Sequence, residues 1–84
     1  MLGVQPKQSR QLLLYPSPAT TSIRVPALLP GTQTELVDRL GRVVRTMPVS
    51  TSGEVSVRDL APGLYILRAT NGQGVPYSGR VLVE

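Results

Sequence analysis

The chain has 84 residues, which is one small domain, and its nine basic and five acidic residues give a net charge of +4. It contains no His and no Cys, which excludes disulfides, the common transition-metal ligands and nucleophilic centres built on Cys or on a Ser–His pair. The five acids are scattered rather than paired and no glycine-rich loop precedes a helical segment, so we expect no enzyme activity, no cofactor and no metal site.

The first ten residues are polar, include Pro6 and show no hydrophobic period, so residues 1–10 are predicted to be a linker or an expression remnant. They hold no apolar core of signal-peptide length, and no part of the chain reaches the ~20 consecutive apolar residues of a membrane span. From residue 11 to residue 84, short apolar runs recur about every ten residues between Gly, Pro, Ser and Thr. We therefore expect one all-β domain, an Ig-like β-sandwich of about seven antiparallel strands.

These strands are expected at residues 11–15, 22–26, 33–38, 42–49, 54–58, 64–70 and 75–83. Alternation is clearest in the fifth, where Val55 and Val57 are expected to face the core, and the second strand alternates in the same way. Residues 12–14 and 81–83 are instead apolar at every position, so these runs are either covered on both faces or expose an apolar row. We therefore expect unprotected strand edges, and a homodimer or strand exchange between copies of the isolated domain.

Two turns have a clear residue signature. Residues 38–41 (Asp-Arg-Leu-Gly) predict a type I turn followed by a glycine with positive φ, closing a hairpin between the third and fourth strands. Residues 71–72 (Asn-Gly) predict a two-residue hairpin loop, which residues 73–74 (Gln-Gly) could lengthen. Pro76 lacks an amide donor, so the last strand is expected to lie at a sheet edge at least where it begins.

Residues 59–69 predict a tyrosine corner, in which a Tyr near the start of a strand hydrogen-bonds to backbone a few residues upstream. The turn at 61–63 contains a Pro that presets φ and a Gly that tolerates positive φ. Tyr65 and Leu67 are expected to face the core, while Arg68 faces water. A plain hairpin could produce the same pattern.

Arginines provide nearly all of the positive charge, and Arg39, Arg42 and Arg45 form the only local cluster, on the predicted hairpin. A nucleic-acid interface would interleave aromatic side chains with such cations, and the chain has three Tyr and neither Phe nor Trp. We expect these cations to lie on solvated strand faces, and we expect no nucleic-acid partner.

Three motifs in a fixed order resemble those of one family. They are residues 15–18 (Tyr-Pro-Ser-Pro), similar to Tyr-Pro-Asn-Pro; residues 38–42, similar to Asp-x-x-Gly-Arg; and residues 60–65, similar to Leu-x-x-Gly-x-Tyr. Residues 78–83 also resemble the closing strand of that family. Over residues 11–84 the chain thus resembles the C-terminal sorting domain, type A, of the type IX (Por) secretion system.

This resemblance implies a seven-stranded Ig-like sandwich appended to a larger secreted protein. Such a domain directs its N-terminal cargo from the periplasm through an outer-membrane translocon to the cell surface or the medium. A surface sortase-like peptidase then removes the domain by cutting the linker, here within residues 1–11. Three residues depart from the family pattern: Ser17 replaces Asn, Val37 stands where an aromatic residue is frequent, and Glu84 stands where a basic residue is common.

The residues expected to carry sorting or recognition come from the three motifs and the closing strand: Tyr15, Pro16, Pro18, Gly41, Arg42, Gly63, Tyr65, Arg80, Val81, Leu82 and Val83. Each has a structural alternative, such as rigidity at the prolines, turn geometry at the glycines or completion of a sheet by the tail. The alternative function is a generic Ig-like or fibronectin-type spacer or adhesion module of a secreted protein. A spacer is expected to be followed by further domains, whereas a sorting domain is expected to end the reading frame. The stop at Glu84, one residue after the last apolar run, leads us to expect a sorting domain.

Overall fold

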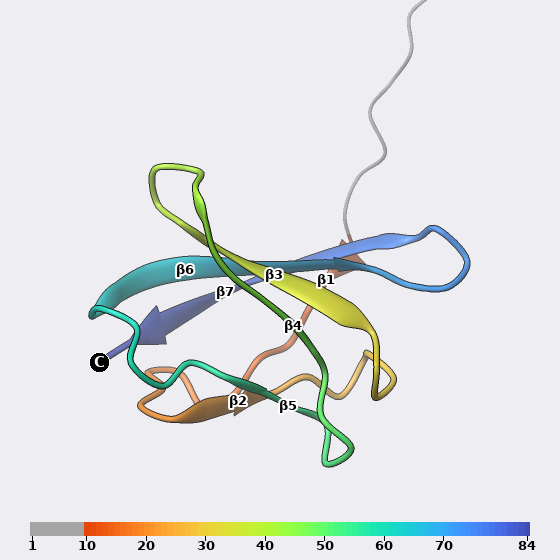
Figure 1. Ribbon diagram of the computed structural model, residues 1–84, viewed down its shortest axis with the longest axis horizontal. Coiled ribbons are helices and arrows are strands. Elements are labelled where there is room, and N and C mark those ends of the chain that lie inside the picture. Colours follow the sequence, from red (N-terminus) through yellow and green to blue (C-terminus); the bar gives the residue numbers. More distant parts are fainter. Residues whose placement is uncertain (1–9) are drawn as a thin grey trace, which may run out of the picture.

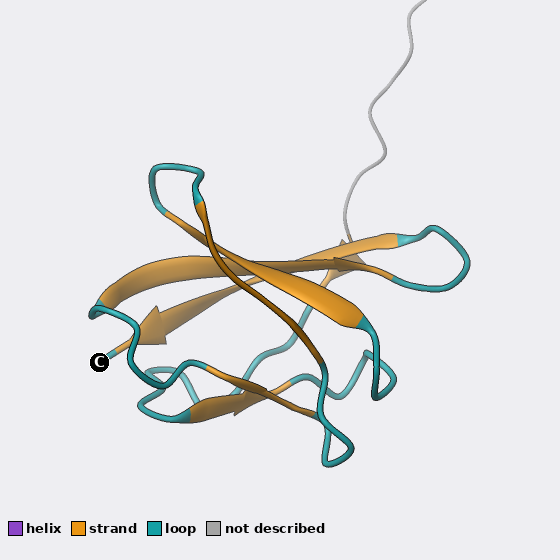
Figure 2. Cartoon of the chain, viewed as in Figure 1, coloured by secondary structure: helices purple, strands orange, loops and turns teal. Residues whose placement is uncertain are grey.

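The computed structural model describes residues 10–84, and the regular structure in this part of the chain is all β-strand (Figures 1 and 2). Its seven strands are β1 (Arg10–Gln11), β2 (Ser22–Arg24), β3 (Gln33–Asp38), β4 (Val43–Pro48), β5 (Glu54–Ser56), β6 (Gly63–Thr70) and β7 (Pro76–Val83). A five-stranded sheet in the order β1-β7-β6-β3-β4 packs over a two-stranded sheet of β2 and β5 (Figure 1). The expected all-β, Ig-like sandwich is confirmed. Within residues 10–84 no helix is long and apolar enough to cross a membrane.

The seven strands pair in antiparallel fashion, except that β1 runs parallel to β7, and the isolated bridge between Ala19 and Val83 is also parallel. The expected strand over residues 11–15 was wrong in extent, because regular pairing covers only Arg10–Gln11. The linker predicted over residues 1–10 lies outside the described residues except for Arg10, which begins β1. The other expected strands are present, with ends that differ by up to two residues.

The first strand is short because the chain changes sheets. The Leu12 amide donates to the Ser78 carbonyl of β7 at 2.7 Å, and three residues later the Tyr15 carbonyl accepts the Arg24 amide of β2, also at 2.7 Å. Between these points Leu12 and Leu14 are buried while Leu13 is 71% exposed. The apolar run thus alternates like a strand while it crosses from one sheet to the other.

After Tyr15 the chain returns to β7 and covers its outer edge. The Ala19 amide donates to the Leu82 carbonyl at 2.7 Å, and the Glu84 amide donates to the Ala19 carbonyl at 2.9 Å. The Leu82 amide donates to Ser17 Oγ at 3.3 Å. We call residues 10–19 the strap. The expectation that residues 81–83 form an unprotected edge was therefore wrong, since the strap occupies that edge.

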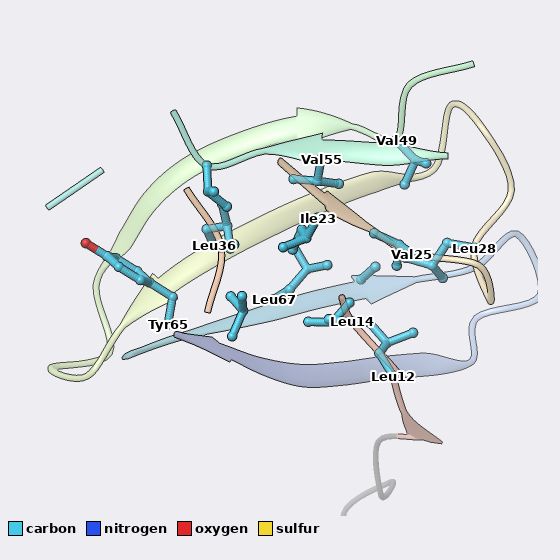
Figure 3. Close-up of a cluster of buried hydrophobic side chains, with 14 of the residues drawn as sticks. Leu12, Leu14, Ile23, Val25, Leu28, Leu36, Val49, Val55, Tyr65 and Leu67 are labelled. Carbon is cyan, nitrogen blue, oxygen red and sulfur yellow. The ribbon is translucent and has the colours of Figure 1, made fainter. Parts of the chain in front are cut away.

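The core lies between the two sheets and is almost wholly aliphatic (Figure 3). Val55 and Val57 face into it from the β5 segment, and Tyr65 and Leu67 face into it from β6, as expected. Thr34 is buried among them, and its hydroxyl donates to the Met47 carbonyl at 2.7 Å, so this polar group is satisfied. The core is therefore supplied by inward positions of β2, β3, β5, β6 and β7 together with residues of the segments between the strands, such as Leu12, Leu14 and Val49.

Three five-residue loops, at residues 38–42, 50–54 and 71–75, have the same construction. In each, the first amide donates to the fifth carbonyl, and the amide of the fourth residue, a Gly with positive φ, donates to the first carbonyl. The first side chain, from Asp, Ser or Asn, accepts the fifth amide. The turn predicted at residues 38–41 is confirmed. The loop after residue 70 takes the longer of the two forms, with Gly74 rather than Gly72 at the positive-φ position.

Candidate recognition surface

The three sequence motifs meet at one end of the sandwich. Asp38 at the end of β3 pairs with Tyr65 near the start of β6, and Gly63 pairs with Val83 at the end of β7. Ala19, which follows the first motif, bridges to Val83. These segments lie at the left of Figure 1, and we call this the C-terminal end. The described chain starts at the opposite end, where Arg10 pairs with Tyr77.

The tyrosine corner is present. The Tyr65 hydroxyl donates to the Ala61 carbonyl at 2.5 Å, and its ring is buried at one edge of the core (Figure 3). Gly63, between them, has a φ of +154°. Residues 61–65 therefore form a rigid corner that fixes where β6 begins.

The hairpin tip at residues 38–42 is organised by one carboxylate. Asp38 Oδ1 accepts the Leu40 and Arg42 amides at 2.9 and 3.0 Å, and Oδ2 accepts Arg42 Nε at 3.1 Å. The Arg42 amide is the main reason that the pKa of Asp38 lies below its ordinary value; desolvation opposes this shift, and the Leu40 amide and the Arg42 guanidinium reinforce it. Gly41, with a φ of +85°, completes the turn.

The first motif lies in the strap and is mostly exposed. Tyr15 is 44% exposed, and the two prolines that follow, Pro16 and Pro18, are exposed and both preceded by cis peptide bonds. The hydroxyl of Ser17, between the two prolines, accepts the Leu82 amide. The motif therefore attaches the strap to the closing strand and presents its rings to solvent.

The closing strand divides into two faces. Val81 and Val83 are buried in the core at 1% and 2% exposure, whereas Leu82 and Arg80 lie on the outer face of the five-stranded sheet. Of the eleven predicted residues, Tyr65, Val81 and Val83 therefore contact the core. The others reach the surface at least in part.

The outer face also carries an apolar row that the sequence analysis did not single out. Leu64 lies opposite Leu82, Ile66 lies opposite Val37, and Val37 lies opposite Val43. We call these five residues the outer ridge. Val37 is buried although it does not belong to the core between the sheets. The sequence contained a signal for the ridge, because residues 64 to 67 of β6 are all apolar and successive residues of a strand face opposite sides of the sheet.

A groove lies between the hairpin tip and the start of β6. It has a volume of about 530 Å³ and is lined by Asp38, Arg39, Leu40, Arg42, Pro62, Gly63, Leu64 and Tyr65. Two of the three motifs thus form its opposite walls, and Leu64 connects it to the outer ridge. We call this the hairpin groove. Leu40 was predicted only as a turn residue, and Arg39 only as a turn residue and a member of the solvated arginine cluster, because nothing local in the sequence shows what a hairpin tip will face.

No group of three or more His, Cys, Asp or Glu side chains over residues 10–84 is placed to hold a metal ion. The groove lining combines Arg39 and Arg42 with Leu40, Pro62 and Leu64, and its one carboxylate, Asp38, is hydrogen-bonded within the hairpin.

Comparison with known proteins gives one result. A family model described as secretion system C-terminal sorting domain matches residues 13–84. Neither the curated proteins nor the solved structures gave a match. The family consists of sorting signals rather than enzymes, and membership implies an N-terminal cargo, the type IX secretion machinery and export to the cell surface or the extracellular space. Because the match covers most of the chain and its motifs gather at one end of a sandwich, this chain belongs to the type IX secretion system C-terminal sorting domain family.

Proposed function

We propose that this domain directs an attached N-terminal cargo from the periplasm across the outer membrane through the type IX translocon. A surface sortase-like peptidase then removes it by cutting within residues 1–11. The domain itself performs no catalysis and needs no cofactor. The observation that carries the proposal is the separation of the two ends: the motifs and the closing strand gather around Val83, whereas the chain enters the fold beside Tyr77. A receptor can therefore contact the C-terminal end while the cargo leaves from the other.

The predicted recognition residues divide into those with an accessible side chain and those that are either buried or glycine. We assign receptor contact to the accessible ones: Tyr15, Pro16, Pro18, Arg42, Arg80 and Leu82. The others shape the surface, through turn geometry at Gly41 and Gly63 and through core packing at Tyr65, Val81 and Val83. This division follows from the principle that a side chain buried in a core makes no intermolecular contact unless the domain opens.

The test fuses residues 1–84 to a periplasmic reporter in a bacterium that has the type IX system. We expect the wild-type fusion to reach the cell surface or the medium, and the double variant Arg80→Ser/Leu82→Ser to lower export at least tenfold. The matched control is Arg58→Ser/Leu29→Ser, which removes the same side-chain types from exposed positions outside the proposed contact set. Retention of the wild-type fusion in the periplasm would overturn the proposal. Export of the tail variant at the wild-type level would remove Arg80 and Leu82 from the recognition surface.

A homodimer of the isolated domain stays a prediction. The reason drawn from residues 81–83 no longer holds, since the strap covers that edge, and β4 is now the outermost strand at the other side of the five-stranded sheet. An unpaired edge strand is a ready site for pairing with a second copy. Sedimentation of a monomer alone at millimolar concentration would contradict it.

A further inference from the structure

The hairpin groove has an apolar floor. Leu40 is 71% exposed and Leu64 is 45% exposed, and Pro62 is the third apolar side chain of this kind in the lining. Exposed aliphatic side chains that gather around a hollow mark a contact surface more often than scattered ones do. The floor continues along the outer ridge through Leu82, which lies opposite Leu64.

The wall formed by the hairpin is cationic. Three charged residues line the groove, and one of them, Asp38, has its carboxylate satisfied within the hairpin. Both of its oxygens accept hydrogen bonds from residues 40 and 42. Arg42 gives only its Nε to this contact, and its side chain remains 73% exposed. Arg39 makes no ion pair with any residue of the described part of the chain. The groove therefore offers two guanidinium groups and no free carboxylate.

The chain has four other acidic residues, Glu35, Glu54, Asp59 and Glu84. Glu35 is paired with Arg68 at 2.9 Å, and Glu54 with Arg24 at 3.8 Å. Glu84 follows β7, which lies on the far side of β6 from the hairpin. None of these acids lines the groove.

We propose that the hairpin groove binds an extended segment of a partner protein in which apolar residues alternate with carboxylates. The apolar side chains rest on Leu40 and Leu64, and a carboxylate pairs with Arg39 or Arg42, whose planar guanidinium groups match carboxylate geometry. This inference rests on the proposed function, because it describes how the export machinery holds the domain. The apolar floor favours a peptide over a phosphate group, and the groove has no exposed ring on which a nucleic-acid base could stack, since Tyr65 is buried.

The first experiment uses isotope-labelled residues 1–84 and two capped tetrapeptides, Leu-Asp-Leu-Glu and its neutral analogue Leu-Asn-Leu-Gln. We expect the acidic peptide to shift the amide resonances of residues 38–42 and 62–65, and to bind at least tenfold more tightly than the neutral one. About 0.5 M salt should weaken this binding, because it screens exposed charges. Arg39→Glu should lower the affinity at least tenfold, while Arg58→Glu, the same charge reversal outside the groove, should leave it unchanged.

Three outcomes would overturn the proposal: equal binding of the two peptides, resonance shifts confined to another surface, or shifts at the groove that inorganic phosphate alone reproduces. The last result would mean a simple anion site. Circular dichroism of the variants controls for folding, and both substituted arginines are exposed.

The second experiment places Arg39→Glu/Leu40→Ser in the reporter fusion, with Arg58→Glu/Leu29→Ser as its control. We expect export to fall at least tenfold for the groove variant alone. If the wild type and the groove variant are exported equally, the groove inference is wrong and the sorting function stands. If even the wild type is retained, the sorting function is wrong, and the peptide experiment still decides whether the groove binds acidic segments.

Discussion

The hydroxyl of Tyr65 ties the turn before β6 to the strand itself. Its hydrogen bond to the Ala61 carbonyl is shielded by the ring's burial. Tyr65→Phe should therefore lower the free energy of unfolding by about 1–2 kcal/mol, the cost of leaving a shielded carbonyl without its donor. Tyr15→Phe, at a half-exposed ring, is the control and should change stability by less than about 0.5 kcal/mol. Urea unfolding of both variants checks this, and equal effects would contradict a tyrosine corner.

Gly79 is the residue on which the strap crosses β7. A Cβ at this position would lie 2.8 Å from the Leu12 carbonyl oxygen and 2.9 Å from the Leu12 Cβ, so backbone would have to move. Gly79→Ala should therefore destabilise the domain by about 1–3 kcal/mol, as overpacking does. Gly72→Ala is the matched control, because its Cβ would meet nothing within 4 Å. The thermal unfolding midpoints of the two variants test this. An unchanged midpoint for Gly79→Ala would mean that the strap can shift at no cost in stability.

Asp38 predicts a dependence of stability on acid pH. The hydrogen bond from the Arg42 amide is the largest of the effects that hold the pKa of the Asp38 carboxyl below its ordinary value. An unfolded chain has an Asp pKa of about 3.9. The contribution of the Asp38 carboxylate to the free energy of unfolding is therefore complete above that pH, and it is lost as the pH falls through the folded-state pKa. Asp38→Asn should therefore reduce the fall in unfolding midpoint between pH 6 and pH 3. A variant as acid-sensitive as the wild type would contradict this assignment.

At the scale of elements, one local rule builds three loops. An Asp, Ser or Asn begins each, and a positive-φ Gly stands three residues later. Gly41→Ala should cost about 1–2 kcal/mol, since Ala is strained at the φ of +85°, whereas Gly41→Asn should cost less because Asn tolerates that region. Denaturant unfolding gives the relative stabilities of the wild type and the two variants. Equal stability of Gly41→Ala and Gly41→Asn would contradict a requirement for positive φ at this position.

The strands could be predicted where polar and apolar residues alternate locally, as in β2 and β5. The first strand was predicted too long because residues 12–14 are uniformly apolar, and nothing local shows that the chain leaves β7 at Leu12 to join β2 at Tyr15. The strap is a tertiary feature for the same reason. Its partners on β7 are more than sixty residues away in the sequence. The two-residue alternation of a strand shows which side chains face the core, but it cannot specify which sheet edge the segment will cover.

For the whole molecule, the closing strand is part of the fold as well as the proposed signal. Deleting residues 80–84 removes two fully buried valines, Val81 and Val83. Their burial alone contributes about 3–6 kcal/mol, comparable to the entire stability of a small domain. The truncated protein should therefore lose its cooperative thermal transition by circular dichroism, whereas Arg80→Ser/Leu82→Ser should keep it. A folded truncation would contradict this, and would make tail deletion a clean test of recognition.

The sequence by itself determined the fold class, the turn at residues 38–41 and the family, because each depends on residue types at short spacing. It left open the length of the loop after residue 70 and the choice between a tyrosine corner and a plain hairpin, which the structure decided. The tertiary structure alone decided that the three motifs share one end of the sandwich, that the strap covers β7, and that Arg39 and Leu40 face Leu64 across a groove. The physical reason is the same in each case. Hydrogen bonding between strands and the closing of two sheets over one core place residues side by side that are 20 to 65 positions apart, and only the folded chain defines that proximity.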